Sequence, residues 1–273
     1  MKSASAEINY CPVPDGRLFY TKAGTGPALL FIHGFCLDHR MWEEQVSFFS
    51  EWYTCISLDL RGFGKSSLPS EKSYSNHEDL YSLLDFLQIR EPVVLIGLSM
   101  GARAATNFAL SYPQRSRALV LVDGAIDGFK FTNFDLGYIY AAAKESGAAV
   151  ANRMWLNHPL FESAGKNALV SQKLEQMVMS YSGWLWTNKN PAITIAPPAI
   201  EQLHKLTMPV LILIGQLDIP DFINLADFIH DQVKHSVRIE IPNAGHMSNM
   251  ENPEIVNIAI RQFLLGIPLT LTS

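Results

Sequence analysis

The chain has 273 residues, of which 48% are hydrophobic and 17% are charged, and its formal net charge is −5. This composition is typical of a soluble globular protein with a sizeable core, and the acidic balance, without runs of lysine or arginine, argues against nucleic acids or anionic membranes as partners. Cys11, Cys36 and Cys55 show neither disulfide-framework nor metal-ligand spacing. We therefore expect no metal, a reducing compartment and a small, mostly neutral ligand.

The sequence contains no segment that indicates export or insertion into a membrane. Residues 1–10 lack the apolar core of a secretion signal, and no apolar run approaches the length of a membrane span. Internal repeats, low-complexity tracts and linkers are also missing from the sequence. We expect a cytoplasmic location, no stable membrane insertion and one continuous fold, and we leave the oligomeric state open.

Short apolar runs alternate with helical patterns along the first part of the chain. A Pro-Asp-Gly turn between two short runs predicts an antiparallel hairpin, and apolar residues that recur on one face predict amphipathic helices. The elements predicted here are the hairpin strands 7–11 and 17–22, the strands 28–33 and 54–59, and the helices 38–49 and 75–87.

The stretch 93–102 joins a buried strand to a helix through a serine. Four apolar residues from Val93 predict a strand that is buried on both faces, and the alanine-rich sequence from Ala102 predicts a helix. Ser99 lies at the turn between them, in the pattern Gly97-x-Ser99-x-Gly101. The turn needs these glycines because a serine held in a strained backbone conformation leaves no room for side chains two residues away.

The rhythm changes after the next predicted strand, 118–122, which ends at Asp123. Residues 126–206 contain helical stretches at 136–154 and 167–180 with tryptophans and tyrosines nearby, but no short strand rich in valine, isoleucine and leucine. The alternation resumes with strands at 209–215 and 236–241 and a closing helix at 253–265.

This alternation predicts an α/β protein with a mostly parallel, doubly wound sheet. The interruption predicts that residues 1–125 and 207–273 form the core domain. Residues 126–206 would then form a helical insertion after the sixth strand.

Four motifs together resemble the α/β-hydrolase fold superfamily, in its serine-nucleophile, esterase-like branch. The first is the Gly-x-Ser-x-Gly turn, which resembles the family's nucleophile elbow. The second is His33-Gly34-Phe35 after a strand, the third is the loop Asp59-x-Arg-Gly-x-Gly-x-Ser, and the fourth is the chain order serine, aspartate, histidine. The resemblance implies that the inserted helices form a cap and that the loop at Asp59 is structural.

The resemblance also assigns roles to individual residues. It implies a catalytic triad of Ser99, Asp218 and His246, with the backbone amides of Phe35 and Met100 as oxyanion donors and with no cofactor. The chemistry agrees, because a serine hydroxyl does not ionise near neutrality, histidine can take its proton, and a carboxylate holds the imidazole in the correct tautomer.

Other residues compete for some of these roles. Asp123 also ends a strand and is an alternative acid, and Asp221 is a weaker one. We expect His33 to support the oxyanion loop by hydrogen bonding, and we expect Cys36 to be a buried small hydrophobe. The remaining six histidines are expected to be solvated, and they are His39, His77, His158, His204, His230 and His235.

The function expected from this resemblance is hydrolysis of carboxylic esters of small to medium, mostly uncharged substrates through an acyl-enzyme. Trp155, Tyr181 and Trp184 are candidates to line an apolar substrate pocket. A carbon–carbon bond hydrolase, a lactonase and a perhydrolase with the same triad stay open as alternatives, and their polar contacts would come from Arg103, Arg153 and Asn107. A non-catalytic ligand receptor on a hydrolase scaffold is the alternative from another class.

Overall fold

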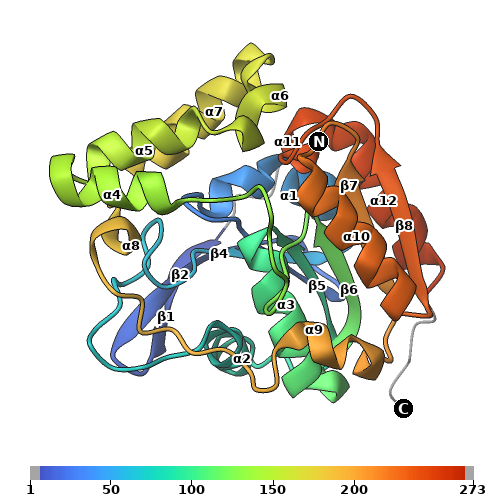
Figure 1. Ribbon diagram of the computed structural model, residues 1–273. Coiled ribbons are helices and arrows are strands. Elements are labelled where there is room, and N and C mark those ends of the chain that lie inside the picture. The colour runs from blue at the N-terminus through green and yellow to red at the C-terminus, as the bar shows by residue number, and fades with distance from the viewer. Residues whose placement is uncertain (1–6, 268–273) are drawn as a thin grey trace.

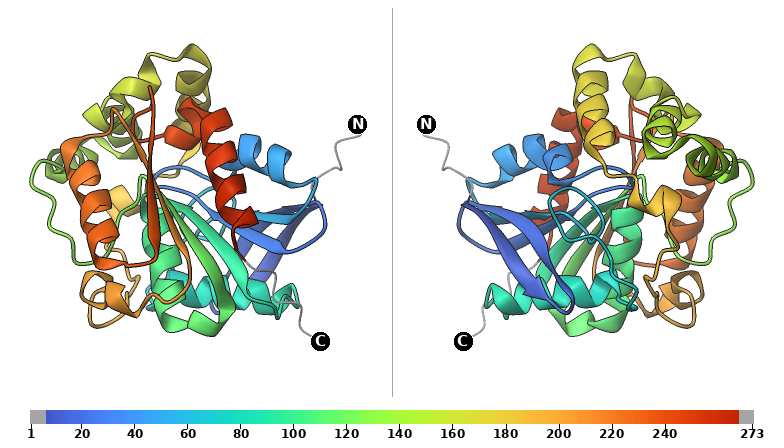
Figure 2. Two further views of the ribbon diagram at one scale, coloured as in Figure 1. Left: turned by 90° about the vertical axis from the view of Figure 1, so that its right-hand side faces the viewer. Right: turned by 90° about the vertical axis from the view of Figure 1, so that its left-hand side faces the viewer.

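The computed structural model of the protein describes residues 7–267, in which a single eight-stranded sheet carries helices on both faces (Figures 1 and 2). The spatial order of the strands is β1-β2-β4-β3-β5-β6-β7-β8. The strands are β1 (Glu7–Val13), β2 (Gly16–Ala23), β3 (Ala28–Ile32), β4 (Thr54–Leu58), β5 (Val93–Leu98), β6 (Ser116–Val122), β7 (Val210–Gly215) and β8 (Ser236–Ile241). The pairs β1–β2 and β2–β4 are antiparallel and all other pairs are parallel, which confirms the expected mostly parallel sheet.

Burial explains why the central strands form where the apolar runs predict them. Every residue of β5 and β7 is buried, as strands covered by helices on both faces must be. The helices outside the segment between β6 and β7 are α1 (Glu43–Phe49), α2 (Asn76–Phe86), α3 (Met100–Ser111), α10 (Pro220–Gln232), α11 (Ser248–Glu251) and α12 (Pro253–Leu265), with the 3₁₀ turns η1 (His39–Trp42) and η2 (Pro113–Arg115). Helix α1 packs against α12, and α2 packs against α3. The helix expected at 38–49 therefore begins as a 3₁₀ turn and becomes α-helical only at Glu43.

The segment between β6 and β7 is helical, and Figure 1 shows α4 to α7 side by side above one end of the sheet. We call residues 126–206 the cap. Its elements are α4 (Gly137–Ser146), α5 (Ala148–Leu156), η3 (Pro159–Phe161), α6 (Glu162–Gly165), α7 (Ala168–Ser180), α8 (Trp184–Thr187), α9 (Ala199–Gln202) and η4 (Leu203–Lys205). The helical stretch expected at 136–154 is formed by two helices, because Gly147, at φ +89°, ends α4 and precedes α5 in a conformation that other residues rarely adopt.

Two further expectations concern burial and membranes. Within residues 7–267 no helix combines the length and the apolar character needed to cross a bilayer. All three cysteines are free thiols in the interior, as expected for Cys36. The expectation that six histidines are solvated is wrong for His77 and His158, which are buried, because the helix and turn that carry them are packed against the core. The first residues of the stretch 1–10 lie outside the described part of the chain.

Candidate active site

Ser99 lies in a tight strand-to-helix turn at the carboxyl end of β5. Its backbone has φ +52° and ψ −114°, and its own amide donates to the Val122 carbonyl on β6 at 3.1 Å. A Cβ on Gly97 would lie 2.4 Å from the backbone of Gly101, and a Cβ on Gly101 would lie 2.1 Å from the Ile32 carbonyl oxygen. The strained serine conformation therefore requires both glycines, which is the reason that the sequence pattern gave for them.

His246 and Asp218 meet at the same edge of the sheet, in the loops that follow β8 and β7. The Nδ1–H of His246 donates to Asp218 Oδ2 at 2.8 Å, and both side chains are almost fully buried. This hydrogen bond leaves Nε2 as the basic nitrogen of the neutral ring. Nε2 is buried and has no hydrogen-bond partner among the described residues. Ser99 and His246 line one cavity, so Nε2 is the ring nitrogen available to the serine.

Asp123 and Asp221, the two alternative acids, accept hydrogen bonds from groups other than His246. Asp123 is fully buried and accepts hydrogen bonds from the Gly215 amide at 2.8 Å and from the Ser248 amide and hydroxyl at 3.0 and 2.6 Å. Asp221 accepts from the amides of residues 132–134 and from a threonine hydroxyl in the same segment. Neither carboxyl is hydrogen-bonded to His246, so Asp218 is the carboxylate that orients the imidazole.

Carboxyl groups hold the turn around His246 on both sides. Glu251 accepts from the amide of Gly245 at 3.0 Å and from that of Met247 at 3.1 Å, and Asp123 accepts from the next amide, that of Ser248. Three amides beside the histidine are thus fixed by two carboxyl groups. Sequence reasoning missed Glu251, whose signal is an acidic residue five positions after His246 in the same short turn.

The same groups set the proton affinity of the histidine. Burial alone would lower the pKa of His246, but the negative charge and hydrogen bond of Asp218, with smaller contributions from Asp123 and Glu251, raise it above its usual value. Burial, followed by the charge of Asp218, raises the pKa of Asp123 to about 8. His246 is therefore hydrogen-bonded to Asp218 and lies near Asp123, a carboxyl group whose burial resists ionisation.

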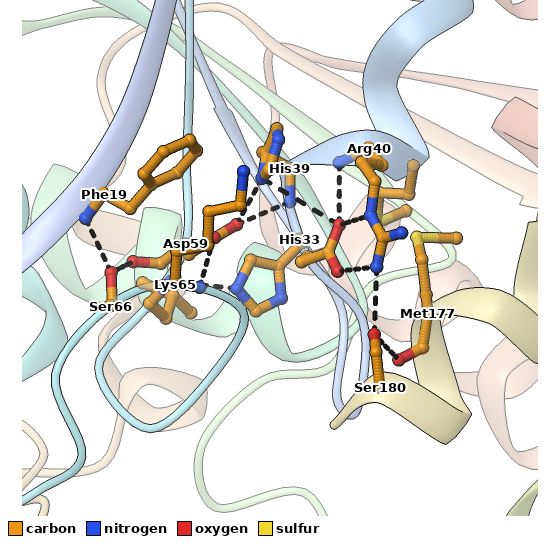
Figure 3. Close-up of polar contacts among 12 residues, drawn as sticks. Phe19, His33, His39, Arg40, Asp59, Lys65, Ser66, Met177 and Ser180 are labelled. Carbon is orange, nitrogen blue, oxygen red and sulfur yellow. Dashed lines mark hydrogen bonds and ion pairs between the residues drawn. The ribbon is translucent and has the colours of Figure 1, made fainter. Parts of the chain in front are cut away.

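The loop after β3 is held by His33, as Figure 3 shows. The Leu60 amide donates to His33 Nε2 at 2.9 Å, so the proton is on Nδ1, which donates to the Gly34 carbonyl oxygen at 2.7 Å. Burial lowers the pKa of His33, which keeps the ring neutral. The Gly34 carbonyl and the Phe35 amide belong to one planar trans peptide and point in opposite directions. By fixing the carbonyl, His33 sets the direction of the Phe35 N–H.

Two backbone amides beside the serine have no partner. Most backbone amides of folded proteins are hydrogen-bonded, yet neither the Phe35 N–H nor the Met100 N–H donates to another residue in the range 7–267. Met100 is the first residue of α3, so its amide also lies at the positive end of a helix. Phe35, Ser99 and Met100 line the same cavity. These amides are available to an anion that forms next to Ser99.

A second polar cluster lies behind this loop and serves the loop's structure. Asp59 accepts from the amide and Nδ1 of His39, both at 2.8 Å, and from the Lys65 amide at 2.8 Å (Figure 3). Asp38, His39 and Asp59 bring ligand-type atoms within 4.8 Å of one another. However, Asp38 is already paired with Arg40 at 2.6 Å. The cluster therefore ties the turn η1 to the loop after β4.

The cavity at Ser99 measures about 380 Å³ and lies between the sheet edge and the cap. Most of its wall is apolar and aromatic, and its lining includes Phe131, Phe134, Leu136, Trp155, Leu160, Phe161 and Phe222. Trp155, one of the three candidates to line a substrate pocket, is therefore a lining residue of this cavity. Tyr181 and Trp184 are not among the described lining residues of this cavity. Tyr181 instead stacks on Phe63 with ring centroids 5.1 Å apart.

The three candidate polar residues lie in different places. Arg103, one turn after Ser99 on α3, lines the cavity, and its Nε lies 3.6 Å from Asp127 Oδ1. Asn107 lines a smaller adjoining cavity of about 180 Å³ that shares Arg103, and Arg153 lies on a separate hollow of the cap surface. Among the described lining residues of the main cavity, Arg103 is thus the one with a permanent charge.

The sheet order and the turn at Ser99 define the protein's class, the α/β hydrolases. A family model described as alpha/beta hydrolase fold matches residues 27–253, and the chain belongs to this family. The expected fold class and the resemblance are confirmed.

Individual relatives are named for several reactions, those of esterases and lactonases among them. A 3-oxoadipate enol-lactonase of Acinetobacter baylyi is 27% identical over 90% of this chain and 92% of its own length. A putative 2-succinyl-6-hydroxy-2,4-cyclohexadiene-1-carboxylate synthase of Bacillus subtilis is 29% identical over 93% of this chain and 97% of its own length. The solved structure of a thermophilic esterase from Thermogutta terrifontis, with malate bound, superposes with a TM-score of 0.82 at 28% identity and covers 97% of this chain and 99% of that one.

Proposed function

We propose that the protein hydrolyses carboxylic esters with Ser99 as the nucleophile, His246 as the general base and Asp218 as the orienting acid. One observation carries this proposal: the strained serine shares a cavity with two unpartnered amides and with a histidine whose other nitrogen is bound to a carboxylate. Each part of that arrangement has a role in acyl transfer, and together they support a catalyst more strongly than a binding module.

In the acylation step, Ser99 Oγ attacks the ester carbonyl carbon while its proton moves to His246 Nε2. The carbonyl oxygen becomes an oxyanion that accepts hydrogen bonds from the amides of Phe35 and Met100. The bond between the carbonyl carbon and the alcohol oxygen then breaks, and the imidazolium returns its proton to the departing alkoxide. An alcohol leaves, and the acyl group stays on Ser99.

Deacylation repeats these steps with water as the nucleophile. His246 takes a proton from water, the hydroxide oxygen bonds to the acyl carbon, and the same two amides stabilise the second oxyanion. Breaking of the bond to Ser99 Oγ releases the carboxylic acid, and the serine recovers its proton from His246. Asp218 keeps Nδ1 protonated throughout, so Nε2 is free to accept each proton.

The size and walls of the cavity support a small to medium substrate with an apolar part. A volume of about 380 Å³ lies at the small end of ligand pockets, and most of its lining is aromatic or aliphatic. Hydrolysis of a p-nitrophenyl ester series from acetate to long chains tests the proposal with wild type and Ser99→Ala side by side. We expect turnover that peaks at one chain length and is lost in the variant; turnover that survives Ser99→Ala would overturn the proposal.

Arg103 favours a second candidate within the same chemistry, an enol-lactone that carries a carboxylate. The enol-lactonase of Acinetobacter baylyi is named for a dicarboxylate, 3-oxoadipate, and Arg103 brings a positive charge to a cavity whose walls are mostly apolar. A lactone contains an ester bond, so the triad and the oxyanion donors would act unchanged. The Arg103→Met variant decides between the two: a lost preference for carboxylated over neutral substrates supports the lactone candidate, and an unchanged preference opposes it.

The proposal extends to organisation and location. We propose that residues 126–206 act as a cap on a core formed by residues 1–125 and 207–273, which is supported by the succession of helices from α4 to α8 beside the cavity. We also propose a cytoplasmic location, which the three buried free thiols support because such thiols persist in reducing compartments.

A further inference from the structure

The side chain of Phe35 is inserted into a group of aromatic rings that belongs mostly to the cap. Its ring centroid lies 4.9 Å from that of Trp186 and 5.8 Å from that of Trp155, and the planes are nearly perpendicular in both pairs. Tyr181 of the cap and Phe63 of the core complete the group at 6.3 and 5.8 Å. We call Trp155, Tyr181, Trp186 and Phe63 the aromatic socket.

The socket holds the residue that donates one of the two free amides. The ring and the amide of Phe35 are attached to the same Cα, so any displacement of the ring that rotation about χ1 and χ2 does not absorb moves the N–H relative to Ser99. His33 fixes the preceding carbonyl from the core side, as described above. The socket fixes the residue from the cap side, and edge-to-face packing of this kind is directional.

A second contact joins the same loop to the cap a few residues later. Arg40 Nη2 donates to Ser180 Oγ at the end of α7 at 3.0 Å, and the Ser180 hydroxyl donates to the Met177 carbonyl at 2.8 Å (Figure 3). Asp38 holds the guanidinium from the other side. The loop that carries the Phe35 amide is therefore attached to the cap at two separate points.

We infer that the cap positions the oxyanion donor, with Trp186 as the main positioning residue and the Arg40–Ser180 contact as a weaker one. This inference rests on the proposed function, in which the Phe35 amide stabilises the oxyanion. The cap then does more than enclose the substrate, because its packing on Phe35 determines how well the transition state is bound. A misplacement of about 1 Å in a catalytic group can cost on the order of 100-fold in rate.

Trp186 allows a clean test because it touches Phe35 without lining the cavity. It is 1% exposed, it is absent from the described lining residues, and its Nε1–H donates to Asn152 Oδ1 at 2.9 Å. Trp186 also packs on Tyr140 and Trp155, two lining residues, with ring centroids 5.0 and 6.2 Å apart. The comparison of kcat with KM therefore separates an effect on Phe35 from an effect on the cavity walls. Phe49 provides a matched control, since it is a fully buried aromatic residue on α1 that packs on Phe48 and Tyr53, away from the socket.

The experiment compares wild type with Trp186→Leu, Trp186→Phe and the control Phe49→Leu. Active sites are first counted by the end point of labelling with a serine-reactive phosphonate. The kcat and KM for one p-nitrophenyl ester are then measured per active site, together with the inhibition constant of an alkyl boronic acid. The Ser99 hydroxyl adds to boron and passes its proton to His246, which gives a tetrahedral adduct with an oxygen at the oxyanion position.

We expect Trp186→Leu to lower kcat per active site by about 10- to 100-fold, a fraction of what loss of a whole oxyanion donor costs. Boronic acid affinity should fall in parallel while KM changes less than about twofold, and Trp186→Phe should restore most of both losses. Phe49→Leu should leave both parameters per active site unchanged. An unchanged kcat in Trp186→Leu, or a loss shared equally by Phe49→Leu, overturns the inference.

A second variant covers the case in which Trp186→Leu does not fold. Ser180→Ala removes an exposed hydroxyl from the Arg40 contact, and we expect the same parallel loss of kcat and boronic acid affinity at about two- to fivefold; no loss overturns the inference. A wild-type protein that is not labelled at Ser99 would instead overturn the proposed function, so the two failures are distinguishable.

Discussion

The turn around His246 and the loop around Phe35 are held by different means. Two carboxyl groups outside the cap accept hydrogen bonds from three amides around the histidine, at positions 245, 247 and 248, and Asp218 holds its ring. Phe35 is held by His33 through a single carbonyl and by aromatic rings that come mainly from the cap. The hydrogen bonds around His246 therefore come from residues outside the cap, whereas Phe35 is packed against residues of the cap as well.

This difference separates two kinds of perturbation. The turn around His246 responds to charge, so pH and the neutralisation of a carboxylate should act on it most strongly. The loop around Phe35 responds to packing, so changes in aromatic side chains of the cap should act there. Variants of the first kind should shift pH profiles, and variants of the second kind should change kcat at every pH.

The largest effect in the turn is expected from Asp218→Asn. The amide cannot hold Nδ1 protonated, so the ring adopts the wrong tautomer and kcat should fall by about 10⁴-fold. Asp123→Asn removes a carboxyl group that does not contact the imidazole, and kcat should fall by about 10-fold at most. Steady-state kinetics of both variants decide the matter, and the reverse ranking would make Asp123 the acid of the triad.

Asp123→Asn should also change how stability depends on pH. The pKa of Asp123 is raised to about 8 in the folded protein and is about 4 when unfolded, so the folded state binds the extra proton between these values. This group's contribution to stability is fully present below about pH 4 and is lost as the pH rises toward 8, at a slope of at most about 1.4 kcal/mol per pH unit. The free energy of unfolding in urea should fall less between pH 5 and pH 8 in Asp123→Asn than in wild type. An equal fall in the two proteins would contradict the raised pKa.

A smaller effect is expected from Glu251→Gln. The negative charge of Glu251 helps to raise the pKa of His246, and the histidine must be neutral to act as a base. Neutralising that charge should lower the pKa of His246 and move the acid limb of kcat/KM to lower pH by a fraction of a unit. The pH profile of kcat/KM measures this shift. A limb that stays in place would mean that Glu251 acts only through its hydrogen bonds.

The smallest effect is expected from Trp184→Leu. Trp184 belongs to the cap but does not line the described cavity, and it makes no ring contact with Phe35 in the described structure. We therefore expect kcat and KM to stay within about twofold of wild type when both are measured with the preferred ester. A large rise in KM would show that substrate reaches this tryptophan.

Local sequence patterns were sufficient for the parts of the site that depend on the backbone. The Gly-x-Ser-x-Gly pattern marks the turn at Ser99, and the strands before Phe35 and Asp218 are continuous apolar runs. The strand before His246 alternates polar and apolar residues. Because parallel strands bring their carboxyl ends to one edge, the order of the motifs was enough to place these residues together.

The parts that depend on side-chain packing could not be predicted in this way. Aromatic composition identified Trp155 and Tyr181 equally, but the cavity takes one of them and the other stacks on Phe63. The role of Glu251 depends on the path of a short turn, and the burial of His158 depends on how η3 packs. The cavity lining and the burial of His158 arise from contacts between segments distant in the chain, for which the local pattern contains no signal, whereas Glu251 lies close to His246 in sequence and could have been found there.

Labelling with a serine-reactive phosphonate tests the central claim most directly. We predict that one phosphonate is bound per chain, that mass spectrometry of the digested protein locates it on Ser99, and that ester hydrolysis is lost in proportion to labelling. The Ser99→Ala variant should bind none. Labelling at another residue, or full esterase activity after Ser99 has been labelled, would contradict the assignment of Ser99 as the nucleophile.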